Sequence, residues 1–306
     1  MIGSLAFLIL GGLLLYFGAE WIVKGGSRLA SQIGLSPLVI GLTIVAFGTS
    51  LPELVVSLTA AIKDSSTIAV GNVIGSNIAN IGLVLGLSSL IFPITITFSR
   101  IRSDLIIYIF SALLFTYFCS DGLIDRSEGV LLFLGIISYT WYCIAHPHHR
   151  VEKMNRGDDP ITKNLLFLLI GAILLFLGSN LFVEGAISIA EILGVSKIAI
   201  GMSVVAFGTS LPELATSIVA AFHKESGISV GNIIGSNLFN ILSVIGIVSW
   251  VHPLKTPQEI MYLEIPFMIA FGAILFPVAL MKQPIAKSSS GILLAGYILF
   301  VFLLFN

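Results

Sequence analysis

The sequence predicts an all-helical membrane protein built from two inverted five-helix repeats, and three observations lead to this prediction. Hydrophobic residues make up 57% of the chain and charged residues only 10%, whereas about a quarter of an average soluble domain is charged. The mean hydropathy is +1.06. The segment 46–57 (AFGTSLPELVVS) recurs at 206–217 (AFGTSLPELATS), and each copy places a glutamate, Glu53 or Glu213, inside a long apolar run.

Ten apolar stretches are candidate transmembrane helices, because an apolar run of about 20 residues spans the hydrocarbon core. In the first half these stretches are 5–23, 37–62, 67–93, 104–119 and 129–145. In the second half they are 164–183, 197–222, 227–253, 260–281 and 289–305. The first stretch has no basic leader and no convincing small-residue cleavage site, so we expect it to remain in the protein as a span.

The two halves are copies of one unit. Adding 160 to each start in the first half gives the starts in the second half to within a few residues, and Asp104 corresponds to Glu264 at the expected interface. An odd number of spans in each unit makes the second unit enter the membrane from the opposite side, as in many secondary transporters. The predicted organisation is a first repeat (1–145), a linker (146–163) and an inverted second repeat (164–306). Broken helices 2 and 7 are expected to meet at the midplane.

The orientation is predicted from the lysines and arginines, which are enriched in short cytoplasmic loops. With both termini outside, eleven of the 15 basic residues lie in cytoplasmic loops and four in outside loops. The linker is then cytoplasmic. Its three histidines (His146, His148 and His149) could bind a metal, but we favour a plain exposed linker. We expect a multi-pass protein of the plasma membrane that works as a monomer in the lipid bilayer.

Charge and cysteine content argue against other classes of protein. The 15 basic residues are balanced by 16 acidic ones, which disfavours a nucleic-acid partner because phosphate binding needs a concentrated basic face. Cys119 and Cys143 lie in apolar stretches without a metal-ligand spacing, so we expect ordinary apolar side chains. We expect no cofactor and no enzymatic activity. An intramembrane hydrolase fits poorly, because no histidine or aspartate base accompanies the serines at membrane depth.

The segment around Pro52 predicts a broken helix. Proline has no N–H for the carbonyl four residues earlier, and its ring crowds that carbonyl. Gly48 weakens the same turn. The break should leave carbonyls near Ala46, Phe47 and Gly48 without helix partners, which a membrane tolerates only where protein, water or an ion satisfies them. These carbonyls are therefore candidate cation ligands.

The repeated glutamate has two interpretations. Ser50 precedes Glu53 by three residues, the spacing of a capping box, so Glu53 could simply cap the following half-helix. However, the same carboxylate occurs near the middle of two long spans, and an inverted repeat places such breaks face to face. Two neighbouring carboxylates repel one another unless a positive charge lies between them. We therefore expect Glu53 and Glu213 to share one cation, and a divalent ion supplies the charge.

A second repeated motif, 70–80 (VGNVIGSNIAN) and 230–240 (VGNIIGSNLFN), adds uncharged oxygens. Gly75 and Gly235 should permit close helix approach. The polar side chains could ligate an ion or could serve helix packing and interhelical hydrogen bonds. They are Ser76, Asn77, Asn80, Ser236, Asn237 and Asn240, with Asn72 and Asn232 as further candidates.

The combined set of candidate ligands contains only oxygen. Calcium accepts about six to eight oxygens in a flexible geometry, and magnesium demands stricter octahedra. Sodium is similar in size to calcium and can use the same oxygens. Zinc or copper would call for histidine or cysteine, and no histidine lies in the middle of a span. A shared set of ligands that holds either one divalent ion or some monovalent ions is the minimum apparatus for exchange.

The motif GTSLPE paired with GNVIGSN, present in both halves, resembles the cation/calcium exchanger superfamily and most closely its prokaryotic sodium/calcium exchangers. The resemblance covers essentially the whole chain. It implies ten helices, a cytoplasmic loop between the fifth and the sixth, and an antiporter that exchanges Ca²⁺ for Na⁺. It also implies alternating access, in which the first and sixth helices slide past a more static core.

The resemblance further implies a set of metal-site residues. The implied central calcium ligands are Glu53 and Glu213, the backbone carbonyls of Thr49 and Thr209, and the side chains of Asn80 and Asn240. The implied flanking sodium ligands are Ala46, Ser50 and Ser76 on one side and Ala206, Ser210 and Ser236 on the other.

The coupling ion has alternatives. Some relatives carry aspartate where this chain has Asn240, and in the potassium-dependent branch an aspartate is linked to potassium, so we expect no potassium requirement. Proton/calcium exchangers typically carry a glutamate in the second motif (GNxxE), where this chain reads GNVIG and GNIIG. Sodium is therefore favoured over H⁺. A passive cation channel is the other alternative, and its transport would show no dependence on a counter-ion.

Overall fold

The computed structural model describes residues 2–146, 160–193, 208–281 and 283–304. The helices of the first half are α1 (Ile2–Ile33), α2 (Pro37–Ile40), α3 (Ala46–Thr49), α4 (Leu51–Ile62), α5 (Ser66–Ala79), α6 (Gly86–Ile91), α7 (Phe98–Cys119) and α8 (Arg126–Ala145). Those of the second half are α9 (Ile161–Ile192), α11 (Leu211–Phe222), α12 (Ser226–Leu238), α13 (Gly246–Val251), α14 (Glu264–Leu280) and α15 (Lys287–Leu304). Three segments have π-helical bonding, η1 (Gly41–Val45), η2 (Asn80–Leu85) and η4 (Phe239–Ile245), and η5 (Gln258–Met261) is a short 3₁₀ helix.

The described residues contain eight helical stretches that are long and apolar enough to cross a membrane, and the bent pair 37–49 with 51–62 adds a ninth. These nine coincide with nine of the predicted spans. The remaining predicted span, 197–222, is described only from residue 208, where it contains α11. Helices α1 and α9 have 32 residues each and are longer than predicted, because both continue through charged residues that lie beyond their apolar parts.

The predicted helix break lies at Ser50, which ends α3 and begins α4 with a bend of 42° between the two arms. Pro52 falls in the first turn of α4, where a missing N–H breaks no helix hydrogen bond. Ser210, just before α11, has nearly the same backbone angles (φ −85°, ψ 3°) as Ser50 (φ −85°, ψ 5°). One detail of the prediction was wrong. The Ala46 carbonyl accepts the Ser50 N–H at 3.0 Å, because helical bonding in α3 persists up to the break.

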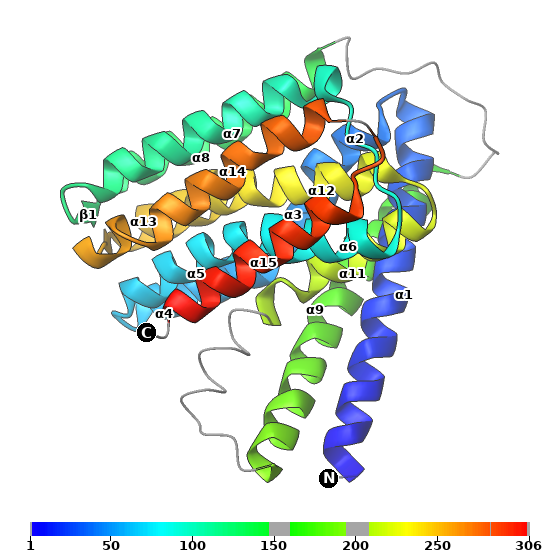
Figure 1. The fold of residues 1–306 in the computed structure, drawn as a ribbon, viewed down its shortest axis with the longest axis horizontal. Coiled ribbons are helices and arrows are strands. Elements are labelled where there is room, and N and C mark those ends of the chain that lie inside the picture. Colours follow the sequence, from blue (N-terminus) through cyan, green and yellow to red (C-terminus); the bar gives the residue numbers. More distant parts are fainter. Residues whose placement is uncertain (1, 147–159, 194–207, 282, 305–306) are drawn as a thin grey trace.

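Helices α1 and α9 lie side by side and project from the rest of the bundle (Figure 1). Glycines at seven-residue spacing bring the two backbones together; they are Gly11, Gly18 and Gly25 in α1 and Gly171, Gly178 and Gly185 in α9. A Cβ at Gly11 would lie 2.5 Å from the Phe182 nitrogen, and a Cβ at Gly178 would lie 2.8 Å from the Leu15 nitrogen. The two helices are therefore packed backbone to backbone, as small residues permit in membranes.

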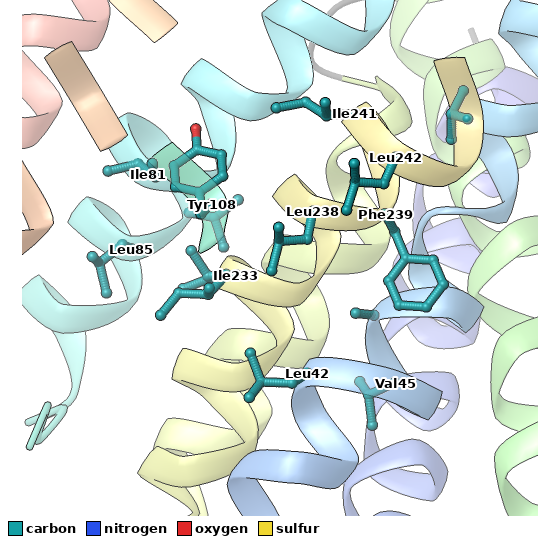
Figure 2. Close-up of a cluster of buried hydrophobic side chains, with 14 of the residues drawn as sticks. Leu42, Val45, Ile81, Leu85, Tyr108, Ile233, Leu238, Phe239, Ile241 and Leu242 are labelled. Carbon is teal, nitrogen blue, oxygen red and sulfur yellow. The ribbon is translucent and has the colours of Figure 1, made fainter. Parts of the chain in front are cut away.

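The centre of the bundle is α12 with η4, in which every residue from Ile228 to Ile245 is buried. Figure 2 shows Leu42 and Val45 beside this segment, with Tyr108 and Ile81 on its other side. Gly235 permits the predicted close approach, since a Cβ there would lie 2.7 Å from the Leu42 carbonyl oxygen. A Cβ at Gly75 would meet no atom of the described residues within 4 Å, so the same role is not supported for Gly75.

Two features differ from the all-helical prediction and its predicted interfaces. A short antiparallel ribbon joins β1 (Leu123–Ile124) to β2 (Leu254–Lys255) and so connects the two halves of the chain. Helix α7 begins at Phe98, before its apolar stretch, so Asp104 lies in the second turn of the helix, where protein buries its side chain fully. Its counterpart Glu264 is the first residue of α14.

Gly11→Ala tests the contact between α1 and α9. We expect this variant to lose about 1–3 kcal/mol of stability, because the added methyl overlaps the backbone of α9. Gly12→Ala is the matched control, since a Cβ at Gly12 meets nothing within 4 Å and alanine favours a helix. Thermal unfolding of both variants in detergent provides the measurement. Equal melting temperatures would show that α1 and α9 do not depend on this contact.

Candidate cation site

The predicted carboxylates lie in equivalent positions of two half-helices. Glu53 is in the first turn of α4 and Glu213 is in the first turn of α11, and both side chains are fully buried. The break at Ser50 explains this placement, because a helix that restarts at Leu51 presents its N-terminal turn in the interior of the bundle. A helix N-terminus favours a negative charge, which partly offsets the cost of burying each carboxylate.

The structure brings predicted residues of the two halves into direct contact. The Ser50 hydroxyl donates to Oε1 of Glu213 at 3.4 Å. The hydroxyls of Thr49 and Ser236 are 3.2 Å apart. On the other side, the hydroxyls of Ser76 and Thr209 are 3.4 Å apart. The two broken helices and the two asparagine motifs therefore meet at one place, although their residues lie more than 130 positions apart in the sequence.

The capping interpretation of the glutamates is not what the structure shows. Neither Ser50 nor Ser210 makes a side-chain capping bond at the start of its helix. The Ser50 hydroxyl instead contacts Glu213 of the opposite half. The Ser-x-x-Glu spacing thus places two polar groups on the inner face of the break instead of closing a capping box.

Asn72 and Asn232 hold the first turns that carry the glutamates. The Asn72 amide donates to the Glu53 carbonyl at 3.3 Å and to the Ser57 hydroxyl at 3.0 Å. The Asn232 amide makes the equivalent bonds, to the Glu213 carbonyl at 3.4 Å and to a serine one turn later at 3.2 Å. Their side-chain oxygens accept from threonine hydroxyls of the other half. For these two asparagines the structure therefore supports the hydrogen-bonding role.

Asn77 and Asn237 orient the two asparagines that were predicted as ligands. The Asn80 amide donates to the side-chain oxygen of Asn237 at 3.0 Å, and the Asn240 amide donates to that of Asn77 at 3.1 Å. Asn77 and Asn237 also donate to each other's backbone carbonyls, both at 3.3 Å. Because the amide nitrogens of Asn80 and Asn240 are held in this way, their carbonyl oxygens point elsewhere.

These contacts repeat with the sequence period. Adding 160 to a residue of the first half gives its counterpart, and the hydrogen bonds of Asn72, Asn77 and Asn80 then become those of Asn232, Asn237 and Asn240. The polar core is therefore close to twofold symmetric in its bonding. The duplication seen in the sequence reappears as two equivalent sets of contacts around one centre.

Six of the twelve buried side-chain oxygens that lack a hydrogen bond in the described part of the chain lie in this region. They are Oε1 and Oε2 of Glu53, Oε2 of Glu213, Oδ1 of Asn80, Oδ1 of Asn240 and Oγ of Ser210. The hydroxyls of Ser76 and Thr209 face the Glu53 carboxylate without reaching the geometry of a direct hydrogen bond. A buried oxygen without a partner costs free energy, so a cluster of such oxygens is suited to a positively charged ligand.

The charge of the site calls for compensation, by a bound cation or by a proton on one of the two acids. Glu53 and Glu213 are close enough to repel one another, and no lysine, arginine or histidine of the described residues forms an ion pair with either. Two buried negative charges are strongly unfavourable without a counter-charge. The unpartnered groups are all oxygens, the donor type that hard cations prefer.

Among the predicted ligands, Ala206 lies outside the described residues. The positioning roles of the four asparagines at 72, 77, 232 and 237 were left undecided by the sequence. The sequence does mark these four asparagines as important, because each occurs in both copies of the second motif. A single sequence cannot say which amide of a buried cluster donates to a neighbour and which carbonyl stays free.

Comparisons with known proteins find similarity over nearly the whole chain. The family model described as "Sodium/calcium exchanger protein" matches residues 3–145 and 163–306. The chain is 32% identical to the sodium/calcium exchanger MaX1 of Methanosarcina acetivorans, over 97% of each protein. It is 33% identical to the inner membrane protein YrbG of Escherichia coli, over 97% of this chain and 94% of that protein. A solved structure of the sodium-calcium exchanger NCX_Mj matches with a TM-score of 0.86 and 34% identity, over 98% of both chains.

Asn77→Ala and Asn237→Ala test the positioning role of the amide pair. Each change leaves the amide of Asn240 or Asn80 without its acceptor, and an unpaired buried donor costs about 1–3 kcal/mol. We expect calcium binding, measured by titration calorimetry, to weaken about tenfold in each variant.

Ser88→Ala is the control for this pair, because its buried hydroxyl has no partner and lies in α6, away from the amides. Its calcium affinity should not change. A loss of affinity in only one of the two asparagine variants would contradict the equivalence of the two halves.

Proposed function

Because this chain belongs to the sodium/calcium exchanger protein family, we propose that it is a secondary active antiporter that exchanges Ca²⁺ for Na⁺ across the membrane. The observation that carries the proposal is the group of six unpartnered buried oxygens. Three of them belong to the carboxylates of Glu53 and Glu213, and the other three come from Asn80, Asn240 and Ser210. One Ca²⁺ balances the charges of both carboxylates, whereas each Na⁺ ion on the same oxygens balances one. Since the ions share ligands, full occupancy by one excludes the other, which is the requirement for exchange.

The proposed ligands are those expected from the sequence. Glu53 and Glu213 bind Ca²⁺ with the Thr49 and Thr209 carbonyls, and the free side-chain oxygens of Asn80 and Asn240 complete the group. The proposed Na⁺ ligands on the two flanks are Ala46, Ser50 and Ser76, and Ala206, Ser210 and Ser236. The Ala46 carbonyl accepts the Ser50 N–H at 3.0 Å and lies 3.3 Å from the Thr49 hydroxyl. The Thr49 hydroxyl has one proton and a nearer acceptor, Oδ1 of Asn232 at 2.9 Å, so the second lone pair of the Ala46 oxygen can accept a cation.

The proposed architecture is ten transmembrane helices in two inverted repeats, 1–145 and 164–306, joined by the linker 146–163. The matching hydrogen bonds of the two asparagine motifs support the twofold relationship. We place both termini outside the plasma membrane and propose that a monomer is the transporting unit, because the polar cluster draws its contacts from both halves of one chain.

Transport by this site requires movement. Glu53 and Glu213 are both fully buried, so an ion cannot exchange with water unless some element shifts. Helices α1 and α9 are the proposed mobile pair, because their glycine contacts join them to one another and they project from the remaining bundle (Figure 1). Alternating access follows if this pair moves as one body relative to α12 and η4.

Sodium is the proposed coupling ion, and its support comes from composition. The second motif carries Gly75 and Gly235 where proton-coupled relatives typically carry an acid, so the central pair of glutamates has no additional acid in that motif. The relative MaX1 is named a sodium/calcium exchanger. Proton coupling and passive conduction are distinguished from this proposal by calcium uptake into proteoliposomes that is driven in turn by sodium, proton and potassium gradients.

Glu53→Gln and Glu213→Gln test the shared carboxylate pair. Glutamine keeps the size of the side chain and removes one negative charge, so the site no longer balances a divalent ion. We expect either change to abolish sodium-driven calcium uptake in sealed vesicles while expression is maintained. Glu184→Gln, at an exposed position of α9, should transport normally. Normal uptake by either site variant would refute the proposed mechanism.

Asn240→Asp tests the ligand role of Asn240. The change adds a third carboxylate beside two others, and like charges at one site favour proton uptake. We expect calcium uptake to become more sensitive to acid and the ion selectivity to change. Uptake is measured as a function of pH and of the external monovalent ion. A profile identical to that of the unchanged protein would remove Asn240 from the ligand set.

A further inference from the structure

A second buried acid lies outside the cation site. Asp104 is in α7, and its side chain is fully buried. Its counterpart in the second half, Glu264, is only partly buried at the start of α14. The burial of this acid is therefore not a shared consequence of the duplication, and it belongs to the first half alone.

The two oxygens of Asp104 have different surroundings. The Tyr139 hydroxyl of α8 donates to Oδ1 at 3.0 Å. Oδ2 is buried and has no hydrogen-bond partner. Cys143, one turn after Tyr139, is buried and interacts with both groups. The carboxyl group of Asp104 therefore lies near one phenol and one thiol, and its Oδ2 makes no hydrogen bond.

No positive charge of the described residues balances Asp104. The elements packed against α7 are α14, α12, η4, β1 and η5. Within these elements the charged residues are Glu264 and Glu259, and both are acidic. Helix α8, which supplies Tyr139, has Arg126 and Glu128 only in its first turn, more than three turns before Tyr139. Arg100 and Arg102 of α7 itself are exposed, and Asp104 forms no ion pair with either. An ionised carboxylate at this position would be a buried, unpaired charge, which is strongly unfavourable.

A metal cation does not fit this position. Calcium needs about six to eight oxygens, and Asp104 with Tyr139 offers one carboxylate and one phenol. A softer metal would need several histidine or cysteine ligands, and here Cys143 stands alone, with no cluster of such side chains in the described residues. A proton needs only one oxygen, and the unpartnered Oδ2 provides it.

We propose that Asp104 is a proton-binding site of the α7–α8 region, separate from the cation site. The proton resides on the Oδ2 side, while Oδ1 continues to accept from Tyr139. The neutral acid suits the apolar surroundings, and loss of the proton leaves an unpaired charge between the two helices. This proposal stands apart from the exchange of Ca²⁺ for Na⁺, because it concerns a proton and residues that do not contact Glu53 or Glu213.

The site also has a structural route to the cation site. Helix α8 packs against η4. Gly135 of α8 lies so close to Leu242 of η4 that a Cβ added at Gly135 would be 3.3 Å from Cδ2 of Leu242. The same turn η4 contains Asn240. A change of charge at Asp104 therefore acts on a helix that supports one of the proposed calcium ligands.

Infrared difference spectroscopy of the protein in lipid nanodiscs tests the proposal directly. The difference between the unchanged protein and Asp104→Asn should contain the carbonyl stretch of a protonated carboxylic acid, and the intensity of this band should fall as the pH rises. In Tyr139→Phe the band should move to higher frequency and persist to higher pH, because the phenol no longer stabilises the ionised form. Glu264→Gln should leave the band unchanged.

Identical carboxylic-acid bands in the unchanged protein and in Asp104→Asn at every pH would overturn the proposal. Thermal unfolding gives a second readout. The melting temperature of the unchanged protein should fall relative to that of Asp104→Asn as the pH rises, because only the aspartate acquires a buried charge. A difference that is the same at every pH would also contradict it. Both measurements are made without ion gradients, so they hold or fail independently of the proposed exchange activity.

Discussion

The structure depends on one electrostatic constraint, namely that two carboxylates face each other in the interior of an apolar bundle. Glu53 and Glu213 are fully buried and repel one another. The desolvation of such a pair costs several kcal/mol per charge, which protein hydrogen bonds alone do not return here, because three of the four carboxylate oxygens lack a partner. A buried pair of this kind is stabilised when a cation lies between the two acids or when one of them holds a proton.

Much of the surrounding polar structure serves to hold ligands without competing for them. Amide groups usually satisfy both their donors and their acceptor when they are buried. In this protein the amide nitrogens of Asn80 and Asn240 are bound by the opposite half, while their oxygens remain unpartnered. Asn72 and Asn232 each fix the backbone of the glutamate turn in their own half. The polar cluster is thus held in place by neutral groups that make no ion pair with the two carboxylates.

The two helices that project from the bundle are organised by a different force. Helices α1 and α9 are joined by backbone contact at glycines, for which van der Waals packing is the driving force in a membrane. The core around α12 is held by large apolar side chains such as Leu42 and Ile233 (Figure 2). Residues of both helices, such as Ala19 and Leu175, also belong to the same buried apolar cluster. The pair is therefore joined to the core through side chains and to itself through backbone.

The sequence by itself determined the class of protein, the duplication and the residues of the central polar cluster. Hydropathy located the apolar part of each helix. The twice-repeated motifs identified the residues of the polar cluster, because polar residues that recur at the same positions of two apolar repeats stand out in the sequence. Hydropathy could not place the ends of α1, α7 and α9, since helices continue through charged residues where neighbouring segments permit it. The burial of Asp104 in α7 was likewise not readable from hydropathy, because it depends on the helices that pack around it.

Only the tertiary structure decided which oxygens are free. Whether Ser50 caps its own helix or contacts Glu213, and whether an asparagine presents its nitrogen or its oxygen, depends on partners about 160 residues away. No local pattern encodes that choice, because the alternatives have the same composition and differ only in the geometry that opposite halves impose on each other.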